Sequence, residues 1–117
     1  MNLNAIMIGS QEPDTLAEYY GRLFGKPAME DGGFSGWQIG DGWLVVGPHD
    51  GVSGSNTEPG RLMWHLESQD VAADFARLRD AGATVVREPY HPREGEQMSI
   101  ATLSDPDGNY FQLMSQM

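Results

Sequence analysis

The sequence passes twice through the same order of predicted elements, and this repetition limits the folds that it can form. Each copy contains an apolar segment, then an amphipathic segment with helical spacing, then further apolar segments around a turn. The segment GDGWLVVGP in the first copy matches PDGNYFQLM in the second, which places Val46 opposite Gln112, 66 residues later. A spacing of this length indicates a duplicated half-domain rather than a short solenoid repeat. The predicted parts are a first half at 1–48, a linker at 49–60 and a second half at 61–117.

Each half contains one predicted helix with a single apolar face. The segment DTLAEYYGRLFG repeats apolar side chains at helical spacing and ends at Gly25, a residue typical of helix C-termini. The segment DVAADFARLRDAG likewise places Val71, Phe75 and Leu78 on one face. The apolar segments around these helices predict two β-α-β-β-β modules, and therefore an α+β fold.

Length and composition exclude several classes of protein. A chain of 117 residues forms one domain in this interpretation, because a second independent core would not fit. The formal net charge of −10 argues against nucleic acid or an anionic membrane as a partner and favours a cationic small molecule. The sequence contains no cysteine, so disulfides and thiolate zinc sites are excluded. No signal peptide or membrane-spanning segment is visible, and we expect a soluble, cytoplasmic protein.

The segment SDPDGNYFQLMS places Asp105, Asp107 and Asn109 at alternate positions, as a calcium-binding loop would. Such a loop also needs a glycine at its sixth position and a glutamate at its twelfth, and this sequence has Tyr110 and Gln116 there. Aspartates and a glycine in this order are instead typical of a hairpin turn with side-chain caps. We therefore interpret the segment as a structural turn.

The DPDGNYFQLMS segment at the end of two β-α-β-β-β halves resembles the vicinal oxygen chelate superfamily, which contains glyoxalase I, extradiol dioxygenases and bleomycin-resistance proteins. The segments TLAEYYGRLFG and HLESQDVAADFARLRDAGATV are similar to the first helix and to the start of the second half in that superfamily. The resemblance covers essentially the whole chain. It implies the glyoxalase/bleomycin-resistance/dioxygenase fold, in which two modules form a curled mixed sheet around a cleft. It does not identify the function, because this fold carries isomerases, dioxygenases, lyases, transferases and binding proteins.

The resemblance also implies four positions at which catalytic members bind a divalent metal, typically through histidine and glutamate. These positions fall on Ala5, Val46, Met63 and Gln112 in this sequence. None of the four residues is a histidine or a carboxylate, and a neutral amide is a poor sole ligand for zinc, nickel or iron. We therefore expect no metal at the inherited site. A metal held by His65 together with loop residues His49 or His91 is a separate alternative, which no ligand spacing supports.

Alternation along the predicted strands separates a helix-facing set of side chains from a cleft-facing set. The cleft-facing set is mostly apolar with a few polar groups, a composition that is common in ligand pockets. His65 is its one histidine and the candidate catalytic residue; the alternative is a histidine paired with Glu67, a backbone carbonyl or water. The expected cleft-facing residues are Ala5, Met7, Val46, Met63, His65, Tyr110, Gln112 and Met114.

Two further residues are candidates at the margin of the cleft. Arg61 precedes a cleft strand and could bind a carboxylate or phosphate, although an exposed surface arginine is the alternative. Trp37 could stack on a planar ligand, and its alternative is burial in the core or in a subunit interface.

These observations favour a metal-independent small-molecule binding protein of the glyoxalase and bleomycin-resistance type. The expected ligand is apolar, planar or cationic, and no cofactor is expected. The alternative is a glyoxalase-like lyase or isomerase, or a dioxygenase-related enzyme, with a non-standard site that uses His65. By the same resemblance, we expect a homodimer.

Overall fold

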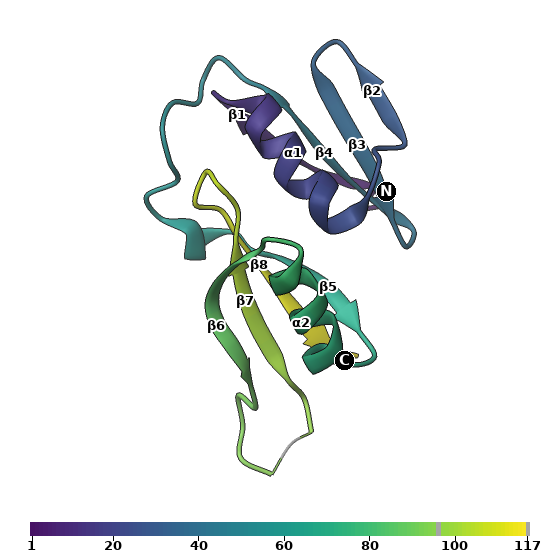
Figure 1. The fold of residues 1–117 in the computed structure, drawn as a ribbon, viewed down its shortest axis with the longest axis vertical. Helices are drawn as coiled ribbons and strands as arrows, with labels where there is room; N and C mark the ends of the chain where they lie inside the picture. The colour runs from purple at the N-terminus through teal and green to yellow at the C-terminus, as the bar shows by residue number, and fades with distance from the viewer. Residues whose placement is uncertain (96, 117) are drawn as a thin grey trace. The chain divides into compact units, whose positions relative to one another are not determined.

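The computed structural model describes residues 1–95 and 97–116, which form two compact units. The first unit covers residues 1–54 and the second covers 55–117. Each unit contains one α-helix and one four-stranded sheet (Figure 1). The two units therefore have the duplicated architecture that the sequence predicts, and the α+β fold is confirmed.

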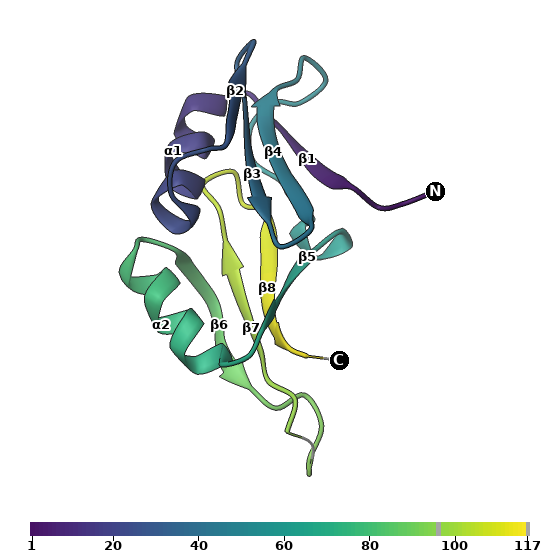
Figure 2. The same cartoon turned by 90° about the vertical axis from the view of Figure 1, so that its right-hand side faces the viewer.

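The sheet of the first unit has the strand order β1-β4-β3-β2. Strand β1 is parallel to β4, and the other neighbours are antiparallel. The helix α1 lies on one side of these strands (Figure 2). The strands are β1 (Ala5–Ser10), β2 (Met29–Asp31), β3 (Phe34–Ile39) and β4 (Gly42–Pro48), and α1 spans Pro13–Phe24.

The apolar face of α1 forms the core of the first unit. Its buried residues are the four that the helical spacing predicts, Leu16, Tyr19, Tyr20 and Leu23. The helix ends at Gly25, whose φ of 90° is a conformation that glycine adopts without steric cost. The buried indole of Trp37 donates a hydrogen bond to the carbonyl oxygen of Gly25 at 2.8 Å, which ties β3 to this end of the helix.

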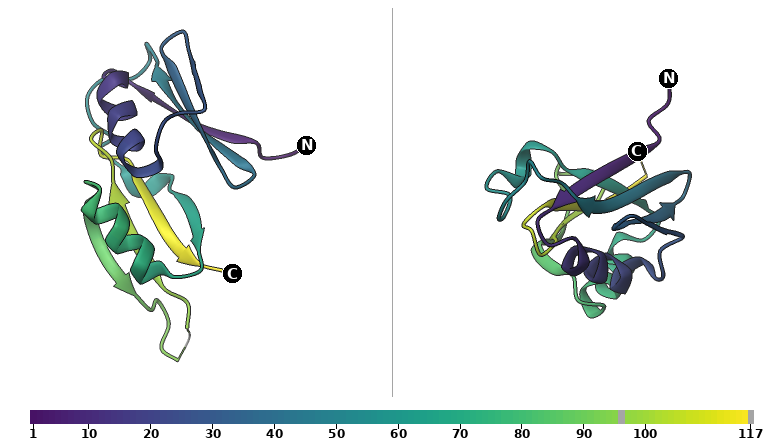
Figure 3. Two further views of the ribbon diagram at one scale, coloured as in Figure 1. Left: turned by 45° about the vertical axis from the view of Figure 1, so that its right-hand side comes forward. Right: turned by 90° about the horizontal axis from the view of Figure 1, so that it is seen from above.

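The second unit repeats this arrangement with the strand order β5-β8-β7-β6. Strand β5 is parallel to β8, and the other neighbours are antiparallel. The helix α2 lies along the strands of its own sheet (Figure 3). The elements are η1 (Pro59–Arg61), β5 (Trp64–Ser68), α2 (Val71–Asp80), β6 (Thr84–Tyr90), β7 (Ile100–Ser104) and β8 (Tyr110–Ser115).

The turn between β7 and β8 is organised by the carboxylate of Asp105. It accepts hydrogen bonds from the backbone N–H groups of Asp107 and Asn109, at 2.9 and 3.0 Å, and from the side chain of Asn109. Gly108 has a φ of 82°, which a residue with a Cβ rarely adopts. The segment is therefore the structural turn that the sequence predicts.

The predicted linker at 49–60 is divided between the two units. Residues up to 54 belong to the first unit, whereas residues from 55 onward belong to the second. Asn56 attaches the second part to the β7–β8 turn: its backbone N–H donates to Asp107 at 2.8 Å, and its side chain donates to Asn109 at 3.0 Å. The second unit thus begins before the position that composition alone indicates.

One local device occurs in both units and shows which positions correspond. Ser10 ends β1, and its Oγ accepts from the backbone N–H of Glu12 at 2.9 Å. Ser68 ends β5, and its Oγ accepts from the backbone N–H of Asp70 at 3.2 Å. Both serines are buried immediately before a helix, so β1 and β5 superpose with Ser10 on Ser68.

Candidate functional site

The second sheet has one face covered by α2 and one face that no helix of the second unit covers. Side chains of paired residues on neighbouring strands point to the same face of a sheet. The buried residues Leu103, Phe111 and Leu113 contribute to the covered face. On β8, Gln112 and Met114 alternate with Phe111 and Leu113. They therefore belong to the opposite face, which we call the open face.

A polar row crosses the open face from β5 to β6. It consists of His65, Gln112, Thr102 and Arg87, which are register partners on the four strands in that order. The amide Nε2 of Gln112 donates a hydrogen bond to the hydroxyl oxygen of Thr102 at 3.0 Å. Since the two ends of an amide group point in opposite directions, Oε1 of Gln112 is turned away from Thr102 and can accept a further hydrogen bond.

The next row on the open face is more apolar. It consists of Glu67, Met114, Ile100 and Tyr90, again on successive strands. The guanidinium carbon of Arg87 lies 3.4 Å from the ring centroid of Tyr90, so the arginine of the polar row reaches over the tyrosine of this row. This cation–π contact also shows that Arg87 and Tyr90 share one face despite the irregular pairing of β6.

A hollow of about 220 Å³ lies at the β5–β8 side of the open face. Its lining residues are His65, Glu67, Met114 and Ser115. An imidazole, a carboxylate and a hydroxyl therefore surround a flexible thioether, and such a combination can hold both polar and apolar parts of a ligand. His65 and Met114 were expected at the cleft from the sequence, whereas Glu67 was considered only as a partner of His65.

The sheet of the first unit also has a face away from its helix. Ala5 pairs with Trp43, and Met7 pairs with Val45, so these four side chains share that face. Met7 is 46% exposed. These four side chains are apolar, and none of them is suited to acid–base chemistry.

The structure corrects the placement of Val46. The side chain of Val46 is 1% exposed and is the register partner of Ile8, on the face that packs against α1. Met7 and His65 occupy equivalent positions, three residues before Ser10 and Ser68 respectively. Their partners are Val45 and Gln112, so the residue equivalent to Gln112 is Val45 and not Val46.

Trp37 and Arg61 also differ from their expected positions. Trp37 is 2% exposed and pairs with Leu44 on the helix side of the first sheet, so it is a core residue and does not line the open face. Arg61 lies in η1 with an exposed side chain, and its Nη2 contacts Oε2 of Glu58 at 2.9 Å. The guanidinium of Arg61 is therefore already paired with a carboxylate.

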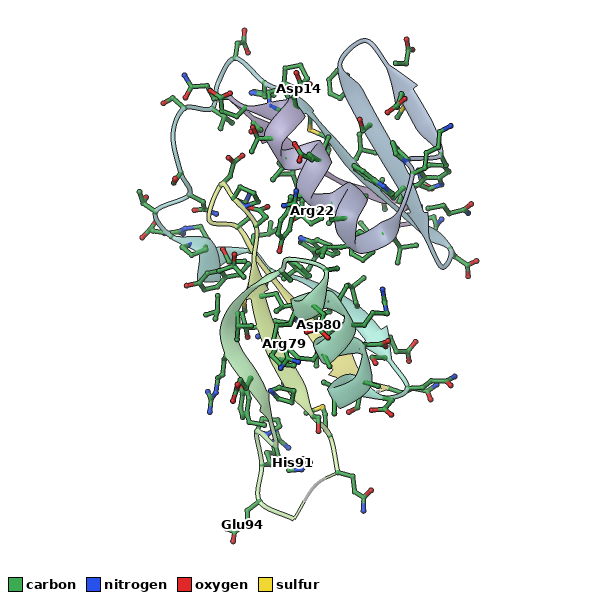
Figure 4. All side chains as sticks on the ribbon, in the orientation of Figure 1. Asp14, Arg22, Arg79, Asp80, His91 and Glu94 are labelled. Atoms are coloured by element: carbon green, nitrogen blue, oxygen red, sulfur yellow. The ribbon has the colours of Figure 1, made fainter. Side chains whose placement is uncertain are left out.

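The remaining expected residues lie near the ends of the strands. Met63 directly precedes β5 and is 36% exposed, and Ala5 begins β1. Tyr110 begins β8, where it is half-buried and pairs with Ser104. His91 belongs to the loop between β6 and β7 (Figure 4), where its Nδ1 is 2.9 Å from the carbonyl oxygen of Met98.

Arg87 and Thr102 are site residues that the sequence did not reveal. Their strands contain no clean alternation, and β6 has register shifts between Val85 and Arg87 and between Arg87 and Tyr90. Each shift moves later side chains relative to the neighbouring strand. The face of a side chain can then no longer be predicted by counting alternate residues along the sequence. The one available signal was an arginine in the segment TVVREPY, and it does not by itself indicate a face.

The residues at the inherited metal positions do not fit a divalent metal. Ala5 and Met63 occupy equivalent places, five residues before Ser10 and Ser68, and Val45 is equivalent to Gln112. This set offers a thioether and an amide but no imidazole or carboxylate, whereas zinc and iron sites need such donors. Within residues 1–95 and 97–116, no group of three His, Cys, Asp or Glu side chains is arranged to hold a metal ion.

Comparison with known proteins identifies the family. Residues 5–114 match a family described as a glyoxalase-like domain. The chain belongs to the glyoxalase-like domain family. This assignment confirms the resemblance to the vicinal oxygen chelate superfamily. No curated protein matches this glyoxalase-like chain.

Solved structures with the same fold include proteins from several bacteria. A glyoxalase-related enzyme from Fulvimarina pelagi is 21% identical, with a TM-score of 0.75 over 99% of this chain and 88% of that one. A glyoxalase/bleomycin resistance protein/dioxygenase family enzyme from Burkholderia phytofirmans PsJN is 18% identical, with a TM-score of 0.74 over 100% of both chains. A glyoxalase/bleomycin resistance protein/dioxygenase from Alicyclobacillus acidocaldarius is 15% identical, with a TM-score of 0.77 over 99% and 92%. At these identities the likeness establishes the glyoxalase-like fold alone.

Neither α1 nor α2, the α-helices of the described residues, has the length and the apolar character that a membrane crossing requires.

Proposed function

We propose that this glyoxalase-like chain binds a small organic molecule on the open face of its second sheet, without a metal at the inherited positions. The observation that carries this proposal is the hollow lined by His65, Glu67, Met114 and Ser115. Small-molecule sites are typically concave, with apolar walls and a few placed polar groups. The open face has this composition, and the Gln112–Thr102 hydrogen bond holds one of its polar groups in a single orientation.

The donor chemistry supports a metal-independent site. The positions equivalent to the ligands of catalytic relatives carry Ala5, Val45, Met63 and Gln112, which provide no anionic or imidazole donor. Binding by shape and hydrogen bonds requires no such donor. We propose that the ligand is an apolar, planar or cationic compound, the class that the sequence favours.

We expect His65→Ala to weaken ligand binding about threefold to tenfold, because the hollow loses a hydrogen-bonding group and part of one wall. The measurement is methyl NMR on methionine-labelled protein, titrated with aromatic, aliphatic and quaternary-ammonium compounds. The Met114 methyl resonance, assigned with Met114→Leu, should shift on binding. His49→Ala is the matched control for the loss of a histidine, because His49 is not among the residues that line the hollow.

Two results would refute the proposal. One is that none of these aromatic, aliphatic and quaternary-ammonium compounds shifts the Met114 methyl resonance. The other is native mass spectrometry that shows one tightly held divalent metal per chain, which the variants Met63→Leu and Gln112→Ala lose or bind more weakly.

A second candidate function is proton transfer by His65, favoured by its position beside Glu67 in the hollow. A histidine that can reach a bound compound can act as a general base near neutral pH. If the chain is an enzyme of this kind, His65→Ala abolishes turnover of a bound compound while its affinity changes much less. If affinity alone falls, His65 serves binding.

We also propose that the chain forms a homodimer. Leu62, Val85 and Val86 expose 73%, 38% and 42% of their surface, and association would remove such apolar area from water. Sedimentation velocity at micromolar and higher concentrations should report a species of twice the chain mass. A monomer throughout this range would contradict the proposal.

A further inference from the structure

Glu67 and Arg87 bring opposite charges to the open face of the second sheet, from opposite edge strands. Glu67 lies on β5 and Arg87 lies on β6, which are the two outer strands in the order β5-β8-β7-β6. Within residues 1–95 and 97–116, neither side chain takes part in a salt bridge. In the same described residues, the guanidinium of Arg87 makes a cation–π contact with the ring of Tyr90.

Glu67 and Arg87 belong to neighbouring rows of the open face, and the side chain of Arg87 reaches across to the row of Glu67. Glu67 pairs with Met114, Met114 pairs with Ile100, and Ile100 pairs with Tyr90. The guanidinium of Arg87 is held over Tyr90, which brings the positive charge to the end of this row. An acidic end and a basic end are thus separated by the side chains of Met114 and Ile100.

The separation prevents the two charges from neutralising each other. Three interstrand spacings of about 4.8 Å place the backbones of β5 and β6 about 14 Å apart. At physiological salt, charges farther apart than about 8 Å are largely screened. Each charge is therefore available to an external partner, and the apolar floor between them favours a hydrocarbon segment.

We propose that the ligand of this site carries an ammonium group and a carboxylate at opposite ends of an apolar chain. The ammonium binds Glu67 at the hollow, the chain covers Met114 and Ile100, and the carboxylate binds Arg87. This inference rests on the proposed function, because it specifies the ligand class of the same face.

The experiment uses a chain-length series of ω-amino acids as probes, from glycine through γ-aminobutyrate and ε-aminohexanoate to ω-aminododecanoate. Each is compared with the n-alkylamine and the n-alkylcarboxylate of equal length, and the Met114 methyl resonance reports binding. We expect the tightest binding for chains of about six to eight carbon atoms, which can span the gap between the two side chains. A doubly charged probe of this length should bind about threefold to tenfold more tightly than either singly charged compound of equal length.

Variants at the two ends distinguish their roles. Glu67→Gln should reduce the affinity of ε-aminohexanoate to that of the carboxylate of equal length, and Arg87→Met should reduce it to that of the amine. The double charge reversal Glu67→Arg with Arg87→Glu should restore much of the binding, because the probe can bind in the opposite direction. Arg79→Met is the matched control: Arg79 also lies over an aromatic ring, that of Phe75, but on α2 (Figure 4).

The outcomes separate this inference from the proposed function. If singly charged or uncharged compounds move the Met114 resonance as strongly as the ω-amino acids do, the site binds small molecules and the zwitterion proposal is wrong. If Arg79→Met weakens binding as much as Arg87→Met does, the effect of Arg87 is not local and the proposal is also wrong. If no compound of any class moves that resonance, both proposals fail.

Discussion

Replacing Phe111 by alanine is expected to lower the free energy of unfolding by about 3–5 kcal/mol. Phe111 is fully buried in β8, an inner strand of the second sheet, and its ring stacks on Trp64 with centroids 4.7 Å apart. Removal of the ring leaves a cavity beneath α2 that the surrounding strands cannot fill without shifting their pairing. The loss combines the hydrophobic transfer free energy of the ring with the cost of that cavity.

Urea denaturation followed by circular dichroism measures this effect. Phe111→Leu, which keeps most of the volume, should cost about 1 kcal/mol. Tyr110→Ala is the matched control, since this neighbouring aromatic residue is half-buried and points to the opposite face, and it should cost about 1 kcal/mol. Equal losses for Phe111→Ala and Tyr110→Ala would show that the core of the second unit does not lie on the α2 side of the sheet.

Replacing Asp105 by alanine is expected to lower the free energy of unfolding by about 2–4 kcal/mol. The carboxylate is 4% exposed and accepts hydrogen bonds from two backbone N–H groups and from the side chain of Asn109. Without it, the two N–H groups lose a charged acceptor inside a turn that water reaches poorly. Hydrogen bonds to a charged group contribute more than neutral ones, so the loss exceeds that of an ordinary surface aspartate.

The controls for this prediction lie in the same turn. Asp107→Asn should change the free energy of unfolding by less than about 0.5 kcal/mol, because the hydrogen bonds described for Asp107 are made by its backbone N–H and carbonyl groups. Asp105→Asn should cost less than alanine, because its Oδ1 can still accept from both backbone N–H groups while its NH₂ opposes the side-chain amide of Asn109. Calcium titration of the unaltered protein provides a further check: a calcium-dependent rise in melting temperature that Asp105→Asn removes would contradict a purely structural turn.

Much of the fold could be predicted because helices and turns depend on neighbouring residues. The buried faces of α1 and α2 are those that the spacing predicts, and Gly25 ends the first helix as expected. The turn at 105–109 also agrees with the sequence. Strand β2 was not predicted by itself, because its three residues are too few to show alternation.

The site could be predicted in part. Alternation along β5 and β8 correctly groups His65, Gln112 and Met114 on one face, because both strands are regular. It fails for Val46, since two residues join β3 to β4 whereas residues 105–109 join β7 to β8. Because the two turns differ in length, aligning their Asp-Gly pairs shifts β4 by one residue relative to β8. A shift of one residue moves each side chain to the opposite face of the strand.

The sequence alone is enough to predict the duplicated α+β architecture, the two helical core faces and the Asp105 turn. Each of these follows from residue identity or from spacing within one element. The tertiary structure was needed to show that the Arg87 guanidinium lies over Tyr90, at the far end of the row that begins with Glu67. It was also needed to place Trp37 and Val46 in the core of the first unit. The physical reason is that strand order, register and bulges are set by hydrogen bonds between segments far apart in the chain, which no local pattern encodes.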